Sequence, residues 1–359
     1  MKKIVILSLV MSVVTGSCLY GQDIHFSQFY MSPLNLNPAL TGVMNCNQRF
    51  VANYRNQWAS VLGPSAFNTY SASYDRKIAV GQYDYFGVGG TLWGDVAGDA
   101  DFQTLQARLS GSYSRRMGGD RDMSHYLVFG ADAGISQRSI DFLKLQFGSQ
   151  HDGNGGFDPS APSGENLARD NFVFADVSAG LLWFTVLNKN NNFYAGAAMH
   201  HINSPDVSFK QDSVVSLFTR YTFHAGGEFA LGSTGLGLVP GVVAFSQGPS
   251  FLLNLGTSLR FTLAQDQFSS NTFQVGAWLR MVNNYLPGSG DTSGSSSSMG
   301  ADAVILSTRF EYQNFGIGFS YDWNVSDLRV ASNGNGAFEF SLVYLICGNE
   351  NRGVYCPHF

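Results

Sequence analysis

Apolar and polar side chains alternate along most of this chain. The segment 252–263 shows the pattern most clearly. One of its faces carries Leu253, Leu255, Thr257, Leu259, Phe261 and Leu263, and the other carries Asn254, Gly256, Ser258, Arg260 and Thr262. Successive side chains of a β-strand point to opposite faces, so the segment predicts a strand with one apolar and one polar face.

About fourteen segments share this alternation, and most are ten to fourteen residues long. They are roughly 49–58, 67–76, 84–94, 102–116, 125–138, 172–184, 192–201, 220–231, 236–245, 251–263, 272–282, 303–312, 314–325 and 336–346. A tilted strand needs about 9–11 residues to cross a bilayer, whereas strands in soluble sandwiches usually have about five or six. The lengths therefore predict an all-β fold, a transmembrane outer-membrane β-barrel of about 14 antiparallel strands.

In such a barrel the apolar faces meet lipid and the polar faces line the lumen. The polar faces carry the charged residues Asp132, Arg138, Glu228, Arg260, Arg280, Arg309 and Glu311. Bulky lumenal side chains such as Trp278 and Arg280 would obstruct a pore. Aromatic residues near the segment ends suit the interfacial girdles of a barrel. They are Tyr54, Trp58, Tyr85, Trp93, Tyr126, Trp183, Phe184, Tyr221, Tyr312, Trp323 and Tyr344.

The connections between the predicted strands alternate in length. Every long connection follows an odd-numbered segment, at about 139–171, 202–219, 283–302 and 326–335. Outer-membrane barrels have short periplasmic turns and long extracellular loops, whereas a soluble sandwich has no reason to follow this rule. The pattern therefore predicts extracellular long loops and, with an even number of strands, two periplasmic termini.

Composition agrees with a membrane barrel and excludes other classes. Charged residues make up only 13% of the 359 residues, against roughly 25% in soluble domains, and aromatic residues make up 14%. The formal charge is −5 and no basic stripe occurs, so nucleic acid is not expected as a partner. Outer-membrane lipid is the expected surrounding, and no small-molecule substrate is expected.

The first residues have the pattern of a secretory signal peptide. Lys2 and Lys3 precede an apolar stretch, residues 4–14, that is too short to span a membrane. We expect residues 1–21 to be removed from the mature chain. Cys18 follows an incomplete lipoprotein box, and its lipidation stays open. No later apolar run reaches 18 residues, so a helical span is not expected.

The remaining chain is divided into a periplasmic N-terminal segment (22–48), the barrel (49–346) and a periplasmic C-terminal tail (347–359). Proline cannot donate a ladder hydrogen bond, so the prolines of the N-terminal segment argue against a central strand there. The segment is predicted either to plug the lumen or barrel mouth or to dock a partner. The candidate residues are His25, Phe26, Phe29, Tyr30, Pro33, Asn37 and Pro38.

Cysteine and histidine positions suggest structure rather than chemistry. An oxidising envelope permits disulfides, and a Cys347–Cys356 bridge would close a short loop, with Cys46 to either of them as the rival pairing. His200 and His201 would point to opposite faces of a strand, which favours a surface or girdle role over metal binding. No catalytic residues, metal ligands or cofactor-binding residues are identified, and no cofactor is expected.

Both ends of the mature chain match a known pattern. The N-terminal stretches are QDIHFSQFY (22–30), SPLNLNPALTG (32–42), NYRNQW (53–58) and YSASYD (70–75), and the chain ends CPHF (356–359). These stretches closely resemble the PorP/SprF family of the type IX secretion and gliding apparatus of Bacteroidetes. The resemblance covers the mature length and is most specific over 22–76.

The resemblance implies a non-enzymatic outer-membrane barrel that works with type IX secretion components. Family members are expected to help export or anchor a secreted surface adhesin that carries a type B C-terminal sorting domain. Some members associate instead with periplasmic ring and motor components. A passive diffusion porin is the alternative function. Neither the identity of the partner, nor conduction through the lumen, nor the oligomeric state follows from the sequence.

Overall fold

The computed structural model describes residues 23–119, 123–153, 156–165, 169–188, 191–210, 213–232, 234–265, 270–284, 298–348 and 356–357. The predicted signal peptide with Cys18 lies outside the described residues, as does most of the predicted C-terminal tail.

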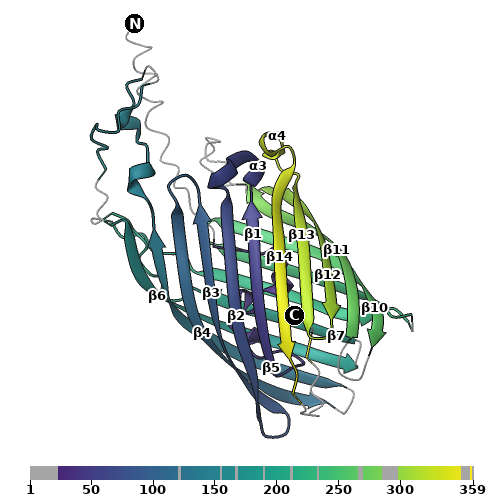
Figure 1. The fold of residues 1–359 in the computed structure, drawn as a ribbon. Helices are drawn as coiled ribbons and strands as arrows, with labels where there is room; N and C mark the ends of the chain where they lie inside the picture. The colour runs from purple at the N-terminus through teal and green to yellow at the C-terminus, as the bar shows by residue number, and fades with distance from the viewer. Residues whose placement is uncertain are drawn as a thin grey trace.

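Fourteen strands of the described chain form a closed antiparallel barrel (Figure 1). They are β1 (Gln48–Gln57), β2 (Phe67–Val80), β3 (Asp84–Ala97), β4 (Phe102–Gly119), β5 (Ser124–Ser139), β6 (Asn171–Asn188), β7 (Asn191–His200), β8 (Arg220–Ala230), β9 (Leu236–Gln247), β10 (Ser250–Gln265), β11 (Ser270–Asn284), β12 (Ser298–Tyr312), β13 (Phe315–Asn324) and β14 (Asn335–Ile346). Each strand pairs with its neighbours in sequence, and β1 pairs with β14 to close the ring. The predicted fold class is confirmed, and most predicted strand limits lie within a few residues of the observed ones.

The barrel exposes its apolar faces and encloses its polar faces. On β10, Leu255 and Leu259 keep 39% and 41% of their surface exposed, whereas Asn254 and Arg260 keep only 2% and 7%. Trp278 and Arg280 are likewise buried on the inner face of β11. The period of two therefore predicted the facing correctly, because a strand buries every second side chain.

The predicted aromatic girdle needs a correction. Tyr54, Trp183, Tyr221, Tyr312 and Trp323 are exposed on the outer face as expected. Four other predicted girdle residues are buried inside the barrel, namely Tyr85, Trp93, Tyr126 and Phe184. Their positions near strand ends suggested a girdle, but their place in the alternation puts them on the lumenal face.

The long connections all follow odd-numbered strands, at 58–66, 140–170, 201–219, 285–297 and 325–334. The longest connection after an even-numbered strand is only 231–235. Several long connections contain short helices, namely α3 (Ala59–Leu62), η3 (Gly63–Ser65), η4 (Phe142–Lys144), η5 (Gly148–Gln150) and α4 (Arg329–Ser332). Figure 1 shows α3 and α4 at the same end of the barrel. No described helix has the length and apolar character needed to cross a bilayer.

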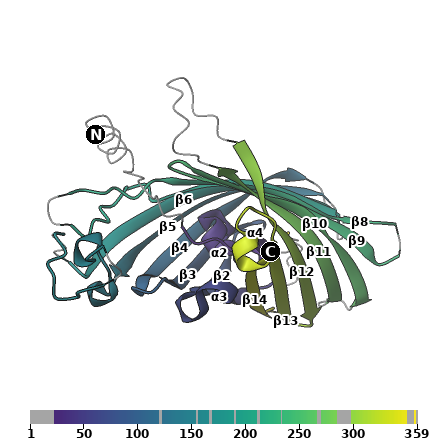
Figure 2. The same cartoon turned by 90° about the horizontal axis from the view of Figure 1, so that it is seen from above.

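Residues 23–47, which we call the lumen segment, lie inside the ring of strands. The segment forms three short helices, η1 (Phe29–Met31), α2 (Pro33–Leu36) and η2 (Pro38–Leu40), and Figure 2 shows α2 enclosed by the barrel wall. Pro33 and Pro38 stand in the first turns of α2 and η2, where the missing N–H has no helical partner to lose. The prolines thus favour short helices over a strand, in agreement with the sequence analysis.

Candidate functional site

The lumen segment contains all seven residues proposed for a plug or docking role. Phe26, Phe29, Pro33, Asn37 and Pro38 are buried, and His25 and Tyr30 are half-buried. The barrel brings them together because they occupy one continuous segment that passes through its interior. The wall residues that hold this segment come from strands far apart in sequence.

Asn37 is the most fully bonded of the predicted residues. Its side-chain amide donates to the carbonyl oxygens of Leu181 at 3.1 Å and Ala197 at 3.2 Å, and it lies 3.0 Å from Nε2 of His224. Its Oδ1 accepts the backbone N–H of Ala39 and so caps η2. One side chain thereby joins the lumen segment to β6, β7 and β8.

The inner face of the wall is shaped to admit the segment. A Cβ added at Gly180 would overlap the side-chain oxygen of Asn37, and one added at Gly130 would overlap the backbone of Ala39. Only glycine leaves room for the Asn37 side chain at Gly180 and for the backbone of the lumen segment at Gly130. The barrel wall and the lumen segment are therefore complementary in shape as well as in hydrogen bonding.

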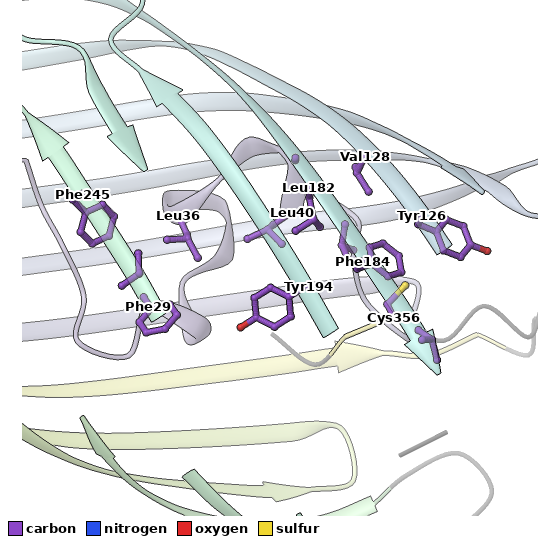
Figure 3. Packing of buried hydrophobic residues seen from close by; sticks show 14 of the residues in the cluster. Phe29, Leu36, Leu40, Tyr126, Val128, Leu182, Phe184, Tyr194, Phe245 and Cys356 are labelled. Atoms are coloured by element: carbon purple, nitrogen blue, oxygen red, sulfur yellow. The ribbon is translucent and has the colours of Figure 1, made fainter. Parts of the chain in front are cut away.

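An apolar cluster packs the segment against the wall. Figure 3 shows Leu36 and Leu40 of the segment in the same cluster as Leu182 and Phe184 of β6. Further along the segment, the ring of Phe29 meets Trp278 edge-on, with ring centroids 5.6 Å apart. Burial of such side chains is worth about 1.5–3 kcal/mol each relative to an exposed state.

A buried ionic network holds the start of the segment. Arg55 bridges Asp322, at 3.1 Å, and Glu339, while Arg280 contacts the same Asp322 oxygen at 2.7 Å. The Ser27 hydroxyl donates to Asp322 at 2.8 Å, and Glu339 accepts the backbone N–H of Gln28 at 2.9 Å. Arg55 and Glu339 are charges on polar faces of predicted strands, but no local pattern distinguishes them from the other charges there.

A second buried pair holds the end of the segment. Arg49 forms a bidentate ion pair with Asp75, through hydrogen bonds of 3.0 and 2.9 Å. It also donates to the carbonyl oxygen of Leu40 at 3.1 Å. The Oδ2 atom of Asp75, one of the two oxygens that Arg49 contacts, also accepts the backbone N–H of Gly42 at 2.7 Å. Paired contacts of this kind fix direction as well as distance, so both ends of the lumen segment are tied to the wall.

His201 forms a third attachment and corrects the predicted role of the histidine doublet. His200 and His201 are 2% and 3% exposed, so neither lies on the surface or in a girdle. His201 leaves the strand with a positive φ of 56° and contacts Asp176, at 2.9 Å, and Asp23 of the lumen segment. Burial alone would lower the pKa of His201, but these two carboxylates outweigh it and raise the pKa to about 9.

The disulfide also differs from the predicted one. Cys46 is bonded to Cys347, with the Cα atoms 4.2 Å apart, so the predicted Cys347–Cys356 bridge is wrong and the rival pairing holds. The bond lies beside the pairing of Gln48 with Ile346, where β1 meets β14. Cys356 is a buried free thiol whose backbone N–H donates to the Asn45 side chain at 2.6 Å. The end of the described chain therefore packs back into the barrel next to the lumen segment.

Two long connections pack together at the opposite end from the disulfide. The ring of Phe209, in connection 201–219, meets Phe172 of β6 and Phe142 of connection 140–170, with ring centroids 5.0 and 6.2 Å apart. Lys210 and Glu165 join the same two connections through an ion pair of 2.6 Å. The predicted loop 283–302 lies largely outside the described residues.

These features define a class of protein. The closed ring of strands, its apolar exterior and its polar interior are those of an outer-membrane β-barrel. The family model for the type IX secretion system membrane protein PorP/SprF matches residues 19–344, and the chain belongs to this family. The family consists of secretion-system membrane proteins rather than enzymes.

Several solved structures match the chain at low sequence identity and with TM-scores below 0.5. The chain is 13% identical to the TodX monoaromatic hydrocarbon channel deltaS2 mutant, with a TM-score of 0.42. The match covers 87% of this chain and 92% of the TodX chain. The chain is 10% identical to CdiB from Escherichia coli, with a TM-score of 0.42. That match covers 82% of this chain but only 63% of the CdiB chain. For BamA from Haemophilus ducreyi lacking POTRA domains 1–3, the values are 10% identity, TM-score 0.36, and coverage of 84% and 70%. None of the curated proteins compared with the chain matches it.

Proposed function

We propose that this protein anchors a secreted surface protein at the outer face of the outer membrane, as a non-enzymatic part of the type IX secretion and gliding apparatus. The partner is an adhesin with a type B C-terminal sorting domain. The long connections are extracellular and hold the adhesin. Both chain ends are periplasmic, and the lumen segment is a fixed plug rather than a docking site.

The packed lumen is the observation that carries this proposal. The lumen segment is held by Asn37, by the network around Arg55 and by the Arg49–Asp75 pair. Breaking a buried ion pair by removing one partner typically costs about 3–5 kcal/mol. An interior tied at several such points favours a barrel that offers binding surfaces over one that conducts a polypeptide.

The seam between β1 and β14 supports the same choice. The two strands pair along the full length of β1, from Gln48 to Gln57, and the Cys46–Cys347 bond closes the end of the seam. Lateral release of a substrate would require this ladder to open. Retention of a partner on the outer loops requires no such opening.

The experiment is deletion of the gene followed by complementation. Surface proteins are released by protease treatment of intact cells and quantified by mass spectrometry. We expect one large surface protein to be lost, other exported proteins to stay at wild-type level, and the wild-type gene to restore display. Unchanged display in the deletion strain would contradict the proposal.

A loop variant separates binding from barrel assembly. Phe209→Ala removes the ring that joins connections 201–219 and 140–170, so it should reduce display of the partner while the barrel still folds. Phe315→Ala, which trims an exposed aromatic residue at the other end of the barrel, is the matched control. Equal loss of display in the two variants would argue against a docking role for the long connections.

The porin alternative is tested by conductance. The purified protein is inserted into a planar bilayer, and single-channel currents are recorded. We expect no large stable conductance, because the lumen segment fills the interior. A stable open level of the wild-type protein would favour the diffusion porin.

A further inference from the structure

An apolar groove of about 750 Å³ lies on the outward surface of the barrel, over β14 and β1 to β5. Small residues form its floor, because Ala52, Ala72, Gly90 and Ala107 take outward positions in four neighbouring strands. Ala52 stands directly opposite Ala72 in the strand register. The groove is as large as pockets that hold small apolar ligands, which measure about 300–1,000 Å³.

Larger side chains form the walls of the groove. Phe50, Tyr74 and Tyr344 make one wall, and the Phe50 ring lies 4.6 and 6.5 Å from the Tyr74 and Tyr344 rings. Leu92 and Ile135, both more than half exposed, stand on the other side. A groove without polar partners does not hold water, and empty space would deprive its lining atoms of dispersion contacts. In the bilayer, hydrocarbon is therefore its natural occupant.

A cation stands next to the aromatic wall. Arg76 follows Tyr74 by two residues, so it is on the same outward face of β2, and it is exposed. It pairs in register with Gln48, the first residue of β1, so it lies level with the end of β1, while β2 continues for four more residues to Val80. Its guanidinium forms no ion pair with any carboxylate of the described residues. An outward cation at the edge of an apolar band attracts phosphate headgroups.

We propose that the barrel binds one phospholipid at this place, with an acyl chain in the groove and the phosphate at Arg76. The two parts of the site match the two parts of the ligand and lie in the same order along β2, from Ala72 through Tyr74 to Arg76. The lipid belongs to the leaflet on the side of the short connections. The proposal does not depend on the identity of the secreted partner.

The test uses the full-length protein in detergent. The protein is incubated with phosphatidic acid or with a diacylglycerol of the same acyl chains, and bound lipid is counted by native mass spectrometry. We expect one phosphatidic acid per barrel and about fivefold lower occupancy by diacylglycerol, which is the effect of about one Arg–phosphate contact. Equal binding of the two lipids, or no binding of either, would overturn the proposal.

Two variants and two controls locate the site. Ala72→Phe fills the groove and should lower binding of both lipids at least fivefold, whereas Arg76→Gln should remove only the preference for phosphatidic acid. Ala277→Phe and Arg115→Gln make the same changes at exposed positions of β11 and β4 outside the groove and should leave binding unchanged.

Equal losses in the controls would refute the assignment. If Ala72→Phe fails to fold, the lipid preference of Arg76→Gln still decides the question. A dimer of the wild-type protein that Ala72→Phe dissociates would show that the groove holds a second copy of the chain instead.

Discussion

A charge placed on the outward face of β10 tests the physical basis of the fold. Leu255 is 39% exposed on this face, and the substitution Leu255→Arg directs a guanidinium into lipid. The strand runs from Ser250 to Gln265, so its midpoint falls between residues 257 and 258. With a rise of about 3.4 Å per residue and a tilt of about 40°, each residue advances about 2.6 Å along the membrane normal.

These dimensions set the expected cost. Leu255 lies about 6–7 Å from the strand midpoint, well within an apolar band about 25 Å tall, so the arginine should destabilise the barrel by about 2–4 kcal/mol. Leu263, on the same face, lies about 14 Å from the midpoint, where arginine costs only about 0–1 kcal/mol. The difference, about 1–4 kcal/mol, amounts to roughly fivefold to a thousandfold in the folding equilibrium.

The assay is reversible unfolding by urea in lipid vesicles, followed by tryptophan fluorescence. Leu255→Arg is compared with Leu263→Arg, and Leu255→Phe controls for size without charge. The phenylalanine variant should remain within about 0.5 kcal/mol of the wild type, as surface substitutions usually do. Wild-type stability of Leu255→Arg, or a larger cost for Leu263→Arg, would refute the assignment of the outer face to lipid.

Three further predictions concern the inside of the barrel. Gly180→Leu should displace the Asn37 side chain, destabilise the barrel by about 1–3 kcal/mol through overpacking and raise single-channel conductance; unchanged current would mean that the lumen segment stays in place. Replacing both Cys46 and Cys347 by serine removes a bridge across 301 residues and should lower the free energy of unfolding by up to about 5–6 kcal/mol, measured by urea titration with and without reductant, where the reductant should act only on the wild type. The pKa of His201 is raised from 6.5 to about 9, so its contribution is complete below pH 6.5 and should be lost as the pH rises through 9, seen as a fall in stability that His201→Gln abolishes.

The lumen site shows where local sequence information ends. The prolines of the lumen segment exclude a central strand, and its apolar and amide residues mark it as a candidate plug. Its contacts join residues up to 312 positions apart, as between Ser27 and Glu339. No local pattern relates such distant positions, so Arg55 and Glu339 stand out only once the barrel has closed.

Local sequence was enough to predict the strands, their facing and the unequal connections. These properties are local, because a period of two decides which side chains share a face and turn residues decide where a strand ends. Tertiary structure decided the pairing of Cys46 with Cys347, since their distance depends on closure of the whole ring. The alternation already assigns Tyr85, Tyr126 and Phe184 to the lumenal face, but only the tertiary structure shows what they meet there. The enclosed lumen segment gives these aromatic rings an apolar neighbour that the polar wall alone does not provide.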